Sequence, residues 1–110
     1  MTFDEYQKKA LATLIRHPDP QMNKTILVMG VAGEAGEVVE KWKKVVAYKD
    51  GVLTDEERAE FGKELADVIW YIAVLAEELG LSLGDLMQQN VEKLASRKAR
   101  GVLKGKGDNR

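Results

Sequence analysis

GEAGEVVEKW at residues 33–42 and KELADVIWYI at residues 63–72 are the two stretches that decide how this chain folds. Each holds two carboxylates three residues apart: Glu34 and Glu37 in the first, Glu64 and Asp67 in the second. Residues three apart share one face of an α-helix, so each pair presents its carboxylates in one direction. A lone ionised carboxylate is costly to bury among apolar neighbours such as these. Four hard oxygen donors are the ligands that Mg²⁺ or Mn²⁺ prefers, so the pattern predicts a metal site.

The length and composition fit one soluble globular domain. The chain has 110 residues, of which 45% are hydrophobic and 32% are charged. No apolar run approaches the roughly 20 residues needed to span a bilayer, and no signal-peptide pattern opens the sequence. The absence of cysteine excludes disulfides, thiolate catalysis and zinc–sulfur sites. These features predict a cytoplasmic protein without a membrane partner.

The net charge of −1 hides an asymmetry along the chain. Residues 1–92 hold 17 acidic and 10 basic side chains, whereas residues 93–110 hold seven basic side chains and one acidic side chain. A basic end on an acidic body is compatible with a nucleic-acid arm, a solvated terminus or a clamp over polyphosphate. We expect one helical domain over residues 1–100, followed by a tail rich in glycine and basic residues over residues 101–110.

Helix punctuation predicts an all-α fold of four helices. Three residues with capping hydroxyls precede an acid by three positions, namely Thr2 before Glu5, Thr54 before Glu57 and Ser82 before Asp85. The predicted helices span about Phe3 to Arg16, Asn23 or Lys24 to Val46, Asp55 to Leu79, and Leu83 to Arg100. Residues 47–51 read as a loop, and Gly80 reads as the C-terminal cap of the third helix.

The second and third predicted helices place their acids beside an apolar sector. On the second helix the sector comprises Val31, Ala35, Val38, Val39, Trp42, Val45 and Val46. On the third helix it comprises Leu65, Val68, Ile69, Ile72, Leu75 and Leu79. If the two sectors pack together, the two acidic pairs converge at one edge of a helical bundle.

Three glycines interrupt the second predicted helix: Gly30, Gly33 and Gly36. Each costs about 1 kcal/mol relative to alanine in a helix interior. Close approach of another helix, or of a ligand, would compensate for that cost.

With these elements in place, the sequence resembles the MazG-like nucleoside triphosphate pyrophosphohydrolases, an all-α superfamily. The resemblance rests on E-x-x-E at Glu34 and Glu37, then 26 residues, then E-x-x-D at Glu64 and Asp67. A third element, N-x-x-K-L-x-x-R, matches Asn90 to Arg97. The resemblance spans residues 25–110, and it is specific because all three elements occur in order.

The resemblance implies Mg²⁺-dependent hydrolysis of an NTP or dNTP between its α- and β-phosphates, with Mn²⁺ as a substitute metal. The products would be a nucleoside monophosphate and pyrophosphate. Carried over to this chain, the metal-binding and catalytic carboxylates are Glu34, Glu37, Glu64 and Asp67. The expected substrate-binding residues are Lys41, Tyr71, Asn90, Lys93 and Arg97. For Tyr71, a place at the rim of the core is an equal alternative, and Lys41 is equally suited to neutralising Glu37.

The wide apolar sectors and the resemblance together predict a homo-oligomer, either a dimer or a tetramer, that completes the helical bundle. Phosphoribosyl-ATP pyrophosphohydrolase is the alternative enzyme, and a non-catalytic helical interaction module is the alternative outside enzymes. No stable nucleic-acid partner is expected, because only the tail suggests one. Base and sugar preference are not encoded in any motif of this sequence.

Overall fold

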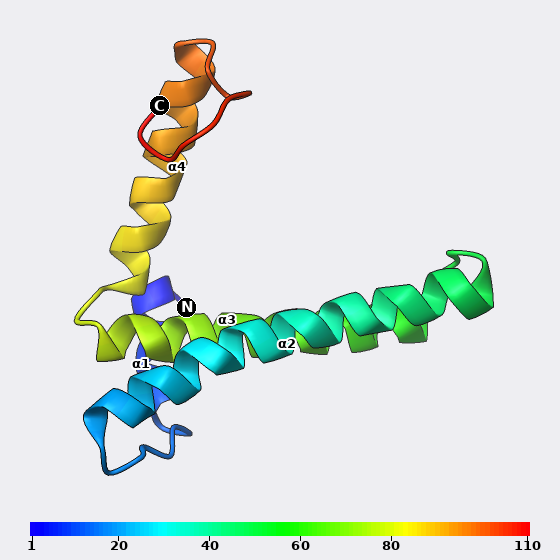
Figure 1. Ribbon diagram of the computed structural model, residues 1–110, viewed down its shortest axis with the longest axis horizontal. Helices are drawn as coiled ribbons and strands as arrows, with labels where there is room; N and C mark the ends of the chain where they lie inside the picture. Colours follow the sequence, from blue (N-terminus) through cyan, green and yellow to red (C-terminus); the bar gives the residue numbers. More distant parts are fainter.

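The computed structural model describes residues 1–110 and contains four α-helices and no strand (Figure 1), which confirms the all-α prediction. The helices are α1 (Phe3–Leu11), α2 (Pro20–Lys49), α3 (Asp55–Glu78) and α4 (Leu83–Ala99). None of the four combines the length and apolar character needed to cross a bilayer.

The predicted helix starts at α1, α3 and α4 are confirmed by their caps. The hydroxyl of Thr2 accepts the N–H of Glu5, and the hydroxyl of Thr54 accepts the N–H of Glu57. In both pairs the glutamate side chain returns a bond to the backbone N–H of its threonine, which completes a capping box. Ser82 caps α4 with its hydroxyl alone.

The boundaries of α1 and α2 differ from those predicted. α1 ends at Leu11, not Arg16, because the Thr13 hydroxyl bonds to the carbonyl of Ala10 and accepts the indole N–H of Trp70. These contacts fix a turn where the helix was expected to continue.

α2 begins earlier and ends later than the sequence pattern indicated. Asp19 accepts the backbone N–H of Gln21, and Pro20 occupies the first helical position, where its missing N–H costs nothing. At the other end, α2 continues to Lys49 through part of the predicted loop. It ends where Asp50 and Gly51 take the left-handed conformation, with φ of 52° and 75°.

The four helices form an open arrangement. α2 and α3 lie side by side over most of their length, α1 crosses α3 at one end, and α4 projects away from the pair (Figure 1). α4 contacts α1 and α3 but not α2. The radius of gyration is 17.0 Å, compared with about 13 Å for a compact domain of this length.

The core is small and lies around α3, the helix that contacts each of the other three. It consists of Ala10, Leu27, Ala73, Val74 and Leu83. The predicted apolar sector of α2 is largely uncovered in the single chain: Val45 is buried, but Trp42 is 47% exposed and Val39 is 68% exposed. The physical reason is that the far half of α2 has only α3 to pack against.

The glycines of α2 have different surroundings. A Cβ on Gly30 would overlap the ring of Tyr71, so this glycine allows the α3 aromatic ring to lie against the α2 backbone. Gly33 and Gly36 have no neighbouring atom within 4 Å of a Cβ position. Helix packing therefore accounts for Gly30 but not for the other two.

Candidate metal centre

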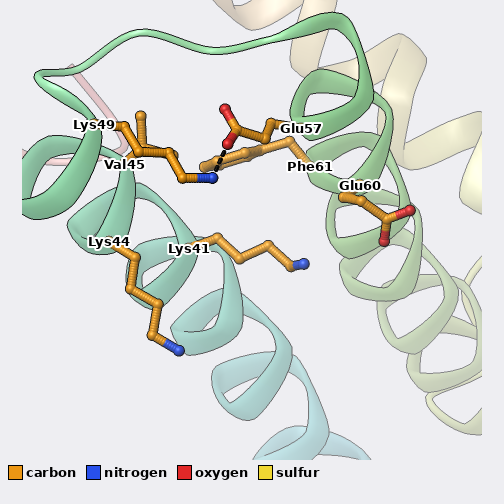
Figure 2. A pocket seen from close by; sticks show the side chains of 7 residues that line it. All are labelled: Lys41, Lys44, Val45, Lys49, Glu57, Glu60 and Phe61. Carbon is orange, nitrogen blue, oxygen red and sulfur yellow. Dashed lines mark hydrogen bonds and ion pairs between the residues drawn. The ribbon is translucent and has the colours of Figure 1, made fainter.

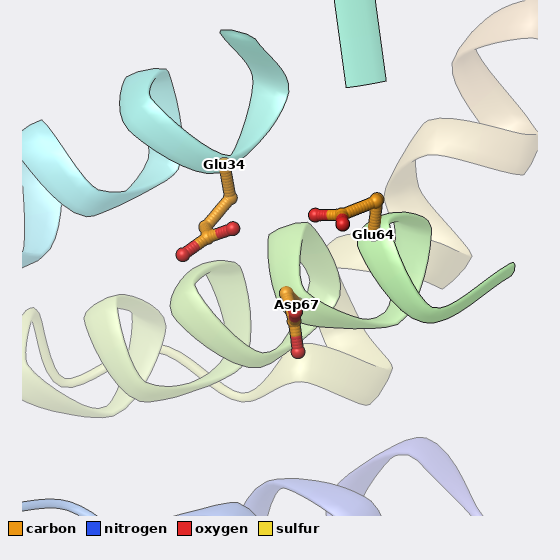
Figure 3. A group of neighbouring side chains, drawn as sticks. All are labelled: Glu34, Glu64 and Asp67. Carbon is orange, nitrogen blue, oxygen red and sulfur yellow. The ribbon is translucent and has the colours of Figure 1, made fainter. Parts of the chain in front are cut away.

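The pairing of α2 with α3 brings three of the four predicted carboxylates together. Glu34 extends from α2 toward Glu64 and Asp67 on α3 (Figure 3), and one oxygen of each lies within 4.8 Å of the others. Glu37 lies one turn further along α2 and is outside this group. The expected convergence of the acidic pairs is thus found for three side chains.

The cluster carries uncompensated negative charge. Partial burial raises the pKa of Glu34, and the charges of Asp67, Glu64 and Glu37 raise that pKa further. One cation approaches: the Nζ atom of Lys41 lies 3.3 Å from an Oε atom of Glu64. A single lysine does not balance the carboxylates, so a divalent cation would relieve both repulsion and desolvation.

The donor set fits Mg²⁺ in both chemistry and size. Ligand oxygens on opposite sides of an octahedral Mg²⁺ lie about 4.1 Å apart, so a group within 4.8 Å needs only a small closure. Three carboxylates from two helices also leave coordination positions for water and phosphate oxygens. Glu34, Glu64 and Asp67 could hold the metal, and Glu37 is near enough to influence the charge of Glu34.

Lys41 also borders a cavity of about 210 Å³ between α2 and α3, beyond the carboxylates (Figure 2). The cavity is lined by Lys41, Lys44, Val45, Lys49, Glu57, Glu60 and Phe61. Its lysines have acidic partners: Lys49 pairs with Glu57 and Lys41 with Glu64. One of the two predicted roles of Lys41 was to neutralise Glu37. In the structure it pairs with Glu64 instead.

Tyr71 of α3 and Tyr6 of α1 have different surroundings. Tyr71 is half-buried against the core, with its ring edge-on to Trp70 at a centroid distance of 4.9 Å. Tyr6 on α1 was not among the predicted site residues. Burial raises its pKa, and the negative charge of Asp67 raises it further. Only the crossing of α1 over α3 reveals Tyr6, so no local sequence signal could have identified it.

An apolar cavity of about 550 Å³ opens between α1 and α3 beside Tyr6. It is lined by Met1, Thr2, Phe3, Tyr6, Ala66 and Ile69. Its volume lies in the range typical of small-molecule sites.

The predicted phosphate-binding residues of α4 are not brought to the carboxylates of the same chain. Asn90, Lys93 and Arg97 lie on α4, which has no contact with the α2 helix that carries Glu34. Arg97 is buried, with its guanidinium bonded to Asp108, and Lys93 pairs with the same aspartate.

Comparisons with known proteins agree with the motifs and the helical architecture. The family model described as the MazG nucleotide pyrophosphohydrolase domain matches residues 22–102. The gene 37 protein of Mycobacterium phage L5 is 51% identical over 84 residues, which is 76% of this chain and 74% of that relative. No solved structure matches the chain. The matched region contains α3, α4 and nearly all of α2, and so both acidic pairs. The chain belongs to the family of the MazG nucleotide pyrophosphohydrolase domain.

Proposed function

We propose that the protein is a Mg²⁺-dependent nucleoside triphosphate pyrophosphohydrolase that converts an NTP or dNTP to the monophosphate and pyrophosphate. The observation that carries the proposal is the convergence of Glu34, Glu64 and Asp67 at the α2–α3 contact. Membership of the family supports the reaction class. The metal, the substrate and the residue roles are our proposal.

Each residue of the candidate site has a distinct proposed role. Glu34, Glu64 and Asp67 would hold the metal, and Mn²⁺ would substitute for Mg²⁺ in the same oxygen site. The bound metal neutralises triphosphate charge and lowers the pKa of coordinated water. Glu37, which lies outside the group of three, is free to accept a proton from the attacking water. Tyr71, which packs against the core, would donate a hydrogen bond to the substrate.

We also propose that the active form is a homodimer or homotetramer. A single copy leaves Val39 68% and Leu65 51% exposed on α2 and α3, and it holds α4 away from its own carboxylates. A second copy would cover those side chains and supply Lys93 and Arg97 to the metal centre. Light scattering during gel filtration should give a mass of at least two chains, about 25 kDa, since one chain is 12.3 kDa. A monomer at micromolar concentration would contradict this proposal.

Product analysis tests the reaction directly. Purified protein with Mg²⁺ is incubated with canonical and modified NTPs and dNTPs and with phosphoribosyl-ATP, and monophosphate and pyrophosphate are quantified. We expect equal amounts of the two products from at least one nucleoside triphosphate, with no inorganic phosphate. Turnover of phosphoribosyl-ATP alone would establish the alternative enzyme, and no turnover by folded, metal-bound protein would leave a non-catalytic module.

A further inference from the structure

The C-terminal segment, residues 101–110, folds back beside the end of α4 (Figure 1). Arg110 holds this shape, because its guanidinium donates to the carbonyls of Val102 and Leu103 at 3.0 Å each and to that of Gly107. Arg100 of α4 in turn donates to the carbonyl of Arg110 at 2.9 Å. The segment is therefore an ordered arm with a defined position on α4.

The arm places a carboxylate on Lys93 and Arg97, the two cations to which the family resemblance gives a role in phosphate binding. An Oδ atom of Asp108 accepts from Nζ of Lys93 at 2.9 Å and from Nη2 of Arg97 at 3.0 Å. The same Nη2 donates to the backbone carbonyl of Asp108. Two cations that converge on one anionic oxygen form an anion site, and this chain fills it with its own side chain.

The two partners in this ion pair differ in their exposure to solvent. The side chain of Arg97 is only 5% exposed, whereas that of Asp108 is 77% exposed. The hydrogen bonds from Lys93 and Arg97 lower the pKa of Asp108, so the carboxylate is ionised at neutral pH. The carboxylate is therefore open to solvent, and its departure with the arm would uncover the arginine.

A phosphate group suits this site better than a carboxylate in one respect. The Nε atom of Arg97 is buried and has no hydrogen-bond partner, because Asp108 engages the guanidinium only through Nη2. A phosphate presents several acceptor oxygens and pairs with a guanidinium through two parallel bonds. The incoming group could therefore satisfy a donor that the present arrangement leaves unpaired.

We propose that the C-terminal arm is an internal competitor of the substrate, in which Asp108 occupies the anion site of Lys93 and Arg97 until a polyphosphate displaces it. The proposal rests on the proposed function only for the identity of that polyphosphate. A site blocked for most of the time binds its ligand more weakly, in proportion to the fraction of molecules that are open. Opening the arm by mutation should therefore strengthen binding.

If the arm instead helps to bind the ligand, opening it should lower the affinity for pyrophosphate. If the bond to Asp108 serves to dock the arm so that Lys104 and Lys106 can grip phosphate, then breaking that bond should weaken binding. The direction of the change therefore separates a competitor from a docked clamp.

The test measures binding of inorganic pyrophosphate, without metal and at low ionic strength, by isothermal titration calorimetry. The variant Asp108→Asn is expected to bind about five-fold more tightly than the unmodified chain. Asp55→Asn is the matched control, because Asp55 is 99% exposed and pairs only with Arg58. It removes the same charge and should leave affinity within about two-fold. Unchanged or weaker binding by Asp108→Asn would overturn the proposal.

A second measurement follows the arm itself. Pyrophosphate should increase the rate at which trypsin cleaves after Lys104 and Lys106, because displacement of Asp108 releases the segment. The variant Arg110→Gln, which removes the bonds that shape the arm, should be cleaved quickly even without pyrophosphate. Protection by pyrophosphate would show that the ligand closes the arm and would overturn the proposal. Neither readout uses turnover, so a failed product analysis and a failed competitor model are distinguishable.

Discussion

Replacing Glu34 with glutamine is expected to lower the affinity for Mg²⁺ by at least about 100-fold and nucleotide turnover by a similar factor. Glu34 is the only member of the group of three that comes from α2, so it is the ligand that joins the two helices through the metal. Glutamine keeps the size of the side chain but removes its charge and one good metal ligand. Calorimetric titration with Mg²⁺ or Mn²⁺ and initial rates of pyrophosphate release measure the two losses.

The same substitution should leave the metal-free fold intact or make it more stable. Neighbouring carboxylates and partial burial raise the pKa of Glu34, which means that its charged form is disfavoured in the folded chain. Removing that charge relieves the repulsion, so the unfolding temperature without metal should not fall. A residue kept for packing would show the reverse, with lower stability and no specific change in metal affinity.

Glu40→Gln is the control for Glu34→Gln. Glu40 lies on the same helix, but it pairs with Lys43 and Lys44 instead of facing α3. Its replacement should leave metal affinity and turnover within about two-fold. If the two variants bind Mg²⁺ with equal affinity, Glu34 is not a metal ligand and the proposed metal centre is wrong.

The carboxylate convergence was predictable because it follows from helical periodicity and one packing choice. Glu64 and Asp67 share a face of one helix, and the apolar sector beside them identifies the face that meets α2. The position of Glu37 outside the group could not be predicted, because its relation to Asp67 depends on the exact rotation of α2 against α3.

Local hydrogen bonds explain which helix boundaries were predicted correctly. The boxes at Thr2 and Thr54 involve partners three residues away, so the sequence contains the whole interaction. α1 instead ends where Thr13 meets Trp70, a partner 57 residues away. The predicted start of α2 lies three or four residues too late, although the Asp19-Pro20 signal that begins the helix is local.

The buried polar residues Gln7, Asn23 and Arg97 were not identified from the sequence as buried. Each sits on a helix whose local pattern allows exposure, and each is covered by contacts made elsewhere in the chain. Arg97 is covered by the arm that carries Asp108, and Asn23 accepts the backbone N–H of His17. Hydrogen bonds to residues outside the same helix leave no periodic trace in a sequence.

Replacing Gln7 with alanine is expected to destabilise the fold by about 3 kcal/mol. The side-chain amide of Gln7 donates to the carbonyls of Leu81 and Ala73 at 2.9 and 3.3 Å, and its oxygen accepts the N–H of Leu83 at 3.0 Å. Gln7 is 4% exposed, so water cannot easily replace these three bonds. Alanine would leave buried backbone groups without partners and would open a cavity beside the core.

Urea unfolding measures this loss, and Gln88→Ala provides the control. Gln88 lies on exposed α4 surface and bonds only to Glu92, so its replacement should change stability by less than about 0.5 kcal/mol. Equal effects of the two substitutions would show that the bonds of Gln7 contribute nothing measurable.

The bonds of Gln7 matter for function because they fix where α4 leaves the core. Gln7 of α1 accepts the N–H of Leu83, the first residue of α4. Asp4, also on α1, accepts from the Ser82 hydroxyl at 2.8 Å and from the Gly84 N–H at 2.9 Å. These contacts lie at the base of a helix that has no contact with α2, so a small change there moves its far end by a larger distance. That far end carries Arg97. Under conditions where Gln7→Ala stays folded, its affinity for Mg²⁺ should be nearly unchanged while nucleotide turnover falls, because a displaced α4 no longer brings Lys93 and Arg97 to the metal centre of the other copy.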